Sequence, residues 1–96
     1  MDTRRSNRSA GTGNAEESGE RIAIADDEAL IRMGLRRILE DAGHTVVAEA
    51  ASGSEALRLV AEVSPSLVIL DIRMPEPNGI EVARRLKVEY PVPVIF

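Results

Sequence analysis

Three aspartates in this sequence follow short apolar runs, where burying a charge costs free energy unless the charge is paired. Asp26 and Asp27 follow the run Ile22–Ala25, and Asp71 follows "LVIL" at residues 67–70. Carboxylate oxygens are the ligands that Mg²⁺ prefers, and a carboxylate beside a cation can attack a phosphoryl group. A single aspartate in such a place is more often a turn former or a helix cap. Metal-assisted phosphoryl chemistry therefore requires all three to lie together.

The elements that would bring these aspartates together are four apolar runs that alternate with three segments of helical periodicity. Strands are expected at 22–25, 44–50, 67–70 and 92–96, and helices at 29–42, 52–64 and 79–90. The order βαβαβαβ predicts an α/β fold, a flavodoxin-like doubly wound parallel sheet with its first and third strands adjacent. Asp26, Asp27 and Asp71 are then expected at one edge, with carboxylates within about 10 Å of each other.

Apolar spacing predicts which face of each helix is buried. The predicted inward residues are Ile31, Leu35, Ile38, Leu39 and Ala42 in the first helix, Leu57, Val60 and Ala61 in the second, and Ile80, Ala83 and Leu86 in the third. Ser52 and Glu55 are spaced as a capping box, and Gly43 is expected to end the first helix. Met33 and Met74 are expected to pack in the core.

Composition excludes several classes of function. The 96 residues carry a net charge of −4, include Tyr90 and Phe96 as the two aromatics, and contain no cysteine. These features argue against nucleic-acid binding, a disulfide framework and a thiolate metal site, and no apolar run approaches membrane-spanning length. A cytoplasmic location is expected. Residues 1–20 are polar and are expected to form a disordered tail, which leaves one domain at 21–96.

Two motifs carry a resemblance to a known family. "IADDEALIR" and "LVILDIRMPEPNGIE" match the pattern D-[DE] after the first strand and D-x-[KR]-M-P-x-x-[DN]-G after the third. The chain from Arg21 to Phe96 thereby resembles the receiver domain of bacterial two-component response regulators. "ADDEALIR" also looks like the subgroup that carries a C-terminal RNA-binding antiterminator (ANTAR-type) module, of which nothing is present here.

The resemblance implies a role for each motif residue. Asp71 would be the phosphoacceptor, which takes a phosphoryl group from a phosphohistidine on a sensor histidine kinase. Mg²⁺ would be held by Asp71, by Asp27 directly, by Asp26 mostly through water, and by the backbone carbonyl of Arg73. Gly79 would allow the tight turn into the third helix. The chain would be a phosphoprotein of a phosphorelay, not an enzyme, with no direct nucleic-acid or membrane partner.

The sequence departs from the complete family pattern after its fourth strand. A complete receiver continues with a Ser or Thr, a fourth helix, a fifth strand ending in Lys, and a fifth helix, and this chain ends at Phe96. The expectation is therefore an incomplete receiver domain that lacks the fifth strand and the last two helices. Its fourth strand would form an uncovered hydrophobic edge through which the chain self-associates.

Three further residues have simpler interpretations. His44 is expected to be a packing or surface residue, Glu28 a first-turn acid favoured by the helix dipole, and the side chain of Arg73 a solvated surface group.

Two other functions remain open on the sequence alone. One is a phosphorylation-independent pseudo-receiver that only binds partners, or a truncated fragment that does not signal. The other is a small nucleotide- or flavin-binding domain. The loop after the first strand is acidic and lacks glycine, so it would repel a phosphate in the absence of a metal.

Overall fold

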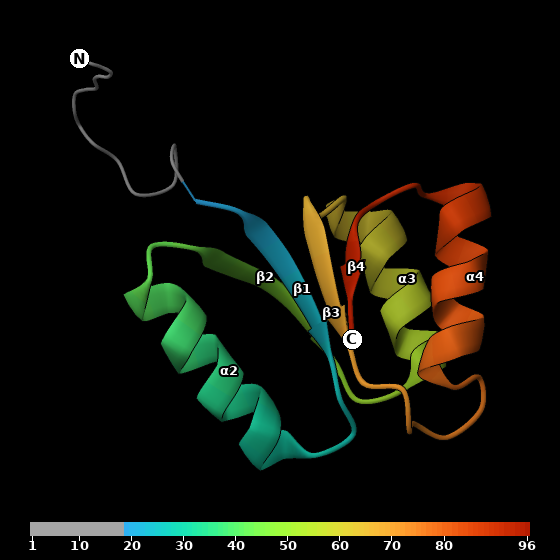
Figure 1. Ribbon diagram of the computed structural model, residues 1–96, viewed down its shortest axis with the longest axis horizontal. Coiled ribbons are helices and arrows are strands. Elements are labelled where there is room, and N and C mark those ends of the chain that lie inside the picture. The colour runs from blue at the N-terminus through green and yellow to red at the C-terminus, as the bar shows by residue number, and fades with distance from the viewer. Residues whose placement is uncertain (1–18) are drawn as a thin grey trace.

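The computed structural model describes residues 19–96, in which four strands alternate with three helices (Figure 1). The strands are β1 (Arg21–Ala25), β2 (Thr45–Ala50), β3 (Leu67–Leu70) and β4 (Val94–Ile95), and the helices are α2 (Ala29–Asp41), α3 (Gly53–Val63) and α4 (Gly79–Glu89). Every predicted element is present, and the ends differ by at most two residues. Within the described range, no helix combines the length and the apolar character that crossing a membrane requires.

The predicted tail lies outside the described residues except for its last two positions, Gly19 and Glu20. The backbone N–H of Glu20 donates to His44 Nδ1 at 2.9 Å, and its carbonyl accepts from the Thr45 N–H at 2.9 Å. Ordered contacts therefore begin before the predicted domain start at residue 21.

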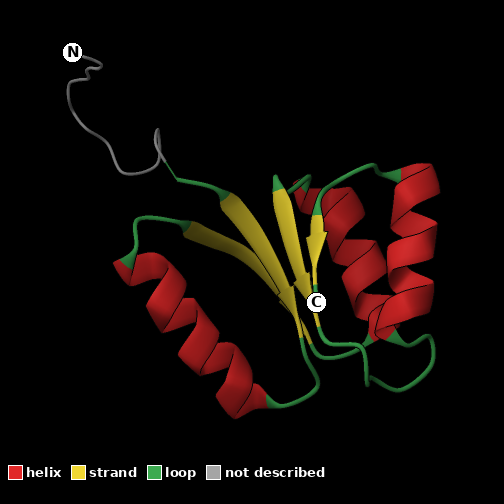
Figure 2. Ribbon diagram, in the orientation of Figure 1, coloured by secondary structure: helices red, strands yellow, loops and turns green. Residues whose placement is uncertain are grey.

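The sheet is parallel throughout, with the strand order β2-β1-β3-β4 (Figure 2). The first and third strands are neighbours, and Ala25, the last residue of β1, is aligned with Leu70, the last residue of β3. This arrangement confirms the predicted flavodoxin-like fold. It also means that the residues following Ala25 and Leu70 leave the sheet at the same edge.

Helices cover both faces of the sheet, with α2 on one face and α3 and α4 on the other (Figure 1). Alternate residues of β1 serve the two sides. Ile22 and Ile24 join Val46 in a smaller core beneath α2, whereas Ala23 and Ala25 join the larger core beneath α3 and α4. Covered strands are buried on both sides, which explains why "LVIL" and "IAIA" read as continuous apolar runs.

Helix α2 is less buried than its periodicity predicted. Leu35 and Leu39 pack against the smaller core, whereas Ile31 and Ile38 are 45% and 66% exposed and Ala42 is also exposed. No residue of α2 is fully buried. A helix that contacts only the sheet buries a narrow stripe, so the prediction is right for Leu35 and Leu39 and wrong for the other three.

The buried face of α4 is rotated from the predicted one. Gly79, Val82 and Leu86 are buried, whereas Ile80 is 52% exposed and Ala83 is only partly buried. Positions 80, 83 and 86 advance by three residues at each step, which falls short of a full turn of 3.6 residues. Their side chains drift around the helix, and the true inward stripe has the spacing i, i+3, i+7.

Helix α3 buries the same spacing. Gly53, Ala56 and Val60 are buried and Leu57 is partly buried, whereas Ala61 is exposed, contrary to prediction. Small residues at the first two inward positions allow α3 to approach its neighbours closely.

The predicted start of α3 is confirmed with one difference. Ser52 Oγ accepts the Glu55 N–H at 3.2 Å, but Glu55 Oε1 accepts the N–H of Ala51 at 2.7 Å instead of that of Ser52. At the end of α2, Gly43 adopts a φ of +97°, a backbone conformation that favours glycine.

Helix α4 has an N-cap, Asn78, that was not predicted from the sequence. Asn78 Oδ1 accepts the Glu81 N–H at 3.0 Å. Hydrogen bonds from Arg85 and then Arg84 hold the pKa of Glu81 below its usual value, which favours the charged form at the positive end of the helix dipole. The residues that follow Asp71 are therefore anchored at the start of α4.

The two edges of the sheet differ in how they are protected. At the β2 edge, the Arg36 side chain pairs with Glu49 and contacts the Val46 carbonyl at 3.4 Å. At the other edge, β4 is hydrogen-bonded to β3 alone, and Ile95 and Phe96 are 52% and 57% exposed. The predicted exposed edge is present, and self-association through it stays a prediction.

Candidate functional site

The acidic site is built where β1 and β3 end. Asp26 follows the last residue of β1, and its N–H donates to the Ala50 carbonyl at 3.0 Å. Asp71 follows the last residue of β3, and its N–H donates to the Ala25 carbonyl at 2.9 Å. The sheet hydrogen bonding thus continues one residue past each strand, which fixes the backbone at both aspartates.

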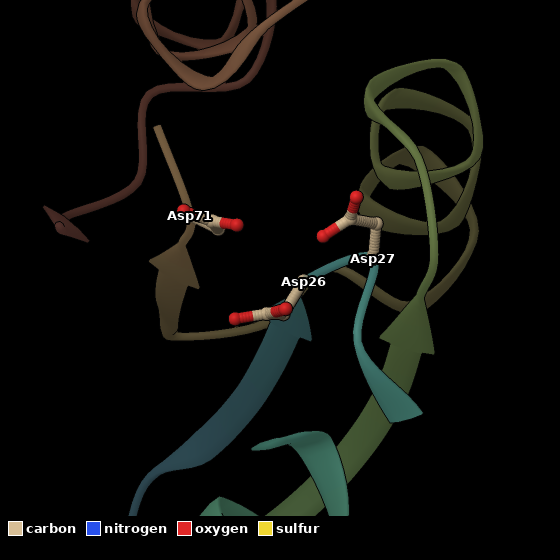
Figure 3. Close-up of side chains that lie close together, drawn as sticks. All are labelled: Asp26, Asp27 and Asp71. Atoms are coloured by element: carbon tan, nitrogen blue, oxygen red, sulfur yellow. The ribbon is translucent and has the colours of Figure 1, made fainter. Parts of the chain in front are cut away.

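Asp26, Asp27 and Asp71 point toward a common space (Figure 3). One carboxylate oxygen from each lies within 4.8 Å of the others. This is well inside the limit of about 10 Å set by a shared metal shell. Asp26 and Asp71 are partly buried and Asp27 is exposed. The predicted convergence is therefore present, and the chemical roles of these residues remain predictions.

Local hydrogen bonds orient two of the three carboxylates. Asp26 Oδ1 accepts the Glu28 N–H at 2.8 Å, and Asp71 Oδ1 accepts the Arg73 N–H at 3.1 Å. Both are bonds to the backbone two residues ahead, a turn that Asp and Asn commonly form. In each case the second carboxylate oxygen is left for another partner.

The donor set suits a hard divalent cation. All three side chains offer oxygen alone, and the chain has no cysteine. Its single histidine, His44, bonds to the Glu20 backbone at the opposite end of β1. Three negative charges this close repel one another, by about 1 kcal/mol per pair at 4 Å in water and about 4 kcal/mol near a protein surface. A cation among them removes that repulsion.

Two predicted loop residues have clear structural roles. Met74 is 6% exposed and belongs to the larger core, as predicted. Arg73 is exposed and touches the site through its N–H, while the predicted use of its carbonyl stays a prediction.

Gly79 acts by close approach and not by an unusual turn conformation. A Cβ at this position would lie 2.3 Å from the Asp71 carbonyl oxygen and 2.7 Å from Ile72 Cα. The Gly79 N–H also donates to the Ile72 carbonyl at 3.0 Å. The start of α4 is therefore in close contact with the backbone of Asp71, the candidate phosphoacceptor.

Gly53, the first residue of α3, makes a close contact that the sequence did not predict. A Cβ there would lie 2.0 Å from the Pro77 carbonyl oxygen and 2.9 Å from Val82 Cγ2. The start of α3 is thus packed against the loop that carries Asp71 into α4. A glycine inside a capping box is the only sequence signal for this contact, and it does not name the partner.

Two other predictions need correction. Met33 is 63% exposed and does not pack in the core. Glu28 is the N-cap of α2 and not a residue of its first turn, and its side chain makes no capping bond.

Arg32 and Glu49 were also missed. Arg32 was not predicted to have a role at the site, but Arg32 Nη1 donates to the Asp26 carbonyl oxygen at 2.7 Å. Glu49 lies within the apolar strand β2 and accepts a bond from Arg32 Nε at 3.3 Å. An acid within an otherwise apolar strand is the sequence signal that could have indicated a partnered position.

Comparison with known proteins identifies the family. The model of the response regulator receiver domain matches residues 22–96. The transcriptional regulatory protein PdtaR of Mycobacterium tuberculosis is 41% identical over 75 residues, which cover 78% of this chain and 37% of that protein. A protein-glutamate methylesterase/protein-glutamine glutaminase of Hahella chejuensis is 43% identical over 74 residues, 77% of this chain and 21% of that protein.

A solved structure agrees with these matches. The response regulator domain of Thermotoga maritima CheB superposes with a TM-score of 0.76 at 34% identity, over 79% of this chain and 57% of that one. The chain spans less than two thirds of each of these three relatives. A family match across residues 22–96 and a shared fold with an acidic cluster at the strand ends lead to one conclusion: this chain belongs to the receiver domain family of response regulators.

Proposed function

We propose that this chain is a phosphoacceptor, in which Asp71 receives a phosphoryl group from a phosphohistidine on a sensor histidine kinase. The observation that carries the proposal is the convergence of three carboxylates within 4.8 Å at the ends of β1 and β3. A pseudo-receiver that only binds partners would gain nothing from this arrangement, and the mutual repulsion of the three acids would lower its stability.

The proposed Mg²⁺ ligands are the side chains of Asp26, Asp27 and Asp71 and the backbone carbonyl of Arg73. Bound Mg²⁺ would supply the positive charge that offsets the oxygens of a transferring phosphoryl group. The chain's own residues orient the nucleophile. The Arg73 N–H engages Asp71 Oδ1, so Oδ2 is the oxygen left to react.

The transfer would proceed by in-line displacement. Asp71 Oδ2 donates an electron pair to phosphorus as the phosphorus–nitrogen bond of the phosphohistidine breaks. That bonding pair stays on the imidazole nitrogen, and the ring takes up one proton from the solvent to become a neutral imidazole. The product is an aspartyl phosphate, a mixed anhydride that hydroxylamine cleaves.

The test is phosphorylation by a small donor. The folded full chain is incubated with acetyl phosphate, with Mg²⁺ or with a chelator, and its intact mass is measured. We expect the mass of one added phosphoryl group with Mg²⁺, its loss on treatment with hydroxylamine, and no addition with the chelator. Folded protein of unchanged mass in Mg²⁺ would contradict the proposal.

Metal binding can be tested at Asp27, which contributes a ligand but is not the proposed nucleophile. In Asp27→Asn we expect Mg²⁺ affinity to fall by at least about tenfold, since a charged ligand is lost. The measurement is the Mg²⁺ dependence of backbone amide shifts by NMR. Glu28→Gln is the control: it removes a neighbouring charge without removing a ligand and should change affinity far less. Equal affinities in the two variants would contradict the proposed ligand set.

The process that this chain would regulate is not defined by its relatives. PdtaR is named a transcriptional regulatory protein. Membership of the antiterminator subgroup stays a prediction for this chain.

A further inference from the structure

The turn between β1 and α2 carries both Asp26 and Asp27, and one arginine ties this turn to the rest of the fold. Arg32 Nη1 donates to the Asp26 carbonyl oxygen at 2.7 Å, and Arg32 Nε donates to Glu49 Oε1 at 3.3 Å. The two charged side chains are 19% and 26% exposed. A single guanidinium therefore links α2, β2 and the acidic turn.

The Asp26 carbonyl is an effective point at which to hold Asp27. A peptide unit is planar, so the carbonyl oxygen of Asp26 and Cα of Asp27 lie in one rigid plane. The Asp26 N–H is already fixed by Ala50, and Asp26 Oδ1 by the Glu28 N–H. Holding the carbonyl as well restrains rotation of this peptide, and the Glu28 N–H bond restrains the next one. Together they limit the direction in which the Asp27 side chain leaves the backbone.

The ion pair with Glu49 does not by itself account for the position of the Arg32 side chain. Glu49 is also bonded by Arg36, so its charge has a partner without Arg32. Ion pairs that keep some access to solvent contribute little to stability. The bond from Arg32 to the Asp26 carbonyl is short and charge-assisted, a stronger class of hydrogen bond. Glu49 orients the guanidinium, and the guanidinium holds the turn.

We propose that Arg32 is a positioning residue for the acidic cluster, which it serves by fixing the peptide between Asp26 and Asp27. The metal readout of this inference rests on the proposed function, whereas its effect on the turn is measurable in metal-free protein.

The sign of the effect on metal binding separates positioning from simple charge. Arg32→Met removes a positive charge near a cation site, so Coulomb's law alone predicts tighter Mg²⁺ binding. Loss of positioning predicts the opposite, a rise of about tenfold in the Mg²⁺ dissociation constant. Arg32→Lys keeps the charge and one donor and should recover part of the affinity. Arg37→Met removes an exposed charge from the same helix and should not weaken binding.

The experiment combines Mg²⁺ titration of amide shifts with hydrogen exchange, in metal-free protein, of the Asp26 and Glu28 amides, both of which are hydrogen-bonded in the turn. We expect weaker Mg²⁺ binding and faster exchange at these two amides in Arg32→Met, with both effects smaller in Arg32→Lys. Unchanged exchange, or Mg²⁺ binding that is equal or tighter, would overturn the inference.

The proposed metal site and the proposed role of Arg32 can be overturned separately. Wild-type protein that is folded but does not respond to Mg²⁺ overturns the proposed metal site, and the exchange rates in metal-free protein then decide the role of Arg32. Uniformly faster exchange across β1 and β3 in Arg32→Met would show general loss of stability and would also overturn the positioning role.

Discussion

Replacing Asp71 with asparagine is expected to abolish phosphorylation by acetyl phosphate completely, without destabilising the protein. Asparagine keeps an acceptor oxygen for the Arg73 N–H but lacks the anionic oxygen that would attack phosphorus. It also removes one of three mutually repelling charges. In the absence of metal, stability should therefore stay equal or rise slightly, whereas the mass increase on phosphorylation should disappear.

The controls for this variant separate chemistry from folding. Asp41→Asn makes the same replacement at an exposed residue at the end of α2 and should be phosphorylated like wild type. Urea unfolding followed by circular dichroism checks that all three proteins are folded. A phosphoryl group that persists in Asp71→Asn, located by peptide mapping on Asp26 or Asp27, would show that the nucleophile is assigned to the wrong acid.

A large effect on stability is expected at Gly79. In Gly79→Ala the new Cβ would lie 2.3 Å from the Asp71 carbonyl oxygen and 2.9 Å from the Asp71 carbonyl carbon. Both atoms belong to the backbone, so no flexible side chain can move aside. We expect a loss of about 3 kcal/mol, the upper end of the usual cost of overpacking, from a total that is about 5–15 kcal/mol for most domains.

The same substitution should also impair the site. Relief of the clash requires the start of α4 to move away from Asp71, and this movement would break the bond from the Gly79 N–H to the Ile72 carbonyl. Slower phosphorylation per folded molecule is therefore expected in addition to the lower urea midpoint. A midpoint equal to that of wild type would show that the contact is not as tight as the structure has it.

Gly34 offers a matched control with the opposite sign. It lies within α2, and a Cβ there would meet nothing within 4 Å. Alanine is favoured over glycine in a helix by about 1 kcal/mol, so Gly34→Ala should raise the urea midpoint. Two glycine-to-alanine changes in one chain are thus expected to move stability in opposite directions.

The local pattern of the sequence was sufficient to predict the elements and the place where the acids meet. Apolar runs that end in Asp26 and Asp71, with helical periodicity between them, allow few arrangements other than a parallel sheet. In such a sheet the carboxyl ends of neighbouring strands share one edge, so the convergence follows from the order of the elements. The predicted distance limit for the three carboxylates was met for this reason.

Local pattern was not sufficient for the helix faces. Ile31, Ile38 and Ile80 were predicted to be buried and are exposed, while Val82 is fully buried. Apolar periodicity defines a broad stripe on an isolated helix, and the angle at which the helix docks selects a narrower one. That angle depends on neighbours that a single segment does not specify.

Only the tertiary structure decided which residues support the site. Arg32 reaches the Asp26 carbonyl because of how α2 lies on the sheet, and Gly53 meets Pro77 because α3 and α4 start side by side. These contacts join segments separated along the chain, and they depend on positions to within an ångström. The sequence by itself determined that three carboxylates share one edge of the sheet, because the order of strands and helices along the chain is encoded locally and the carboxyl ends of parallel strands share an edge. The bond from Arg32 to the Asp26 carbonyl and the close contacts of Gly53 and Gly79 depend on packing between elements, which is defined only when all the elements are assembled.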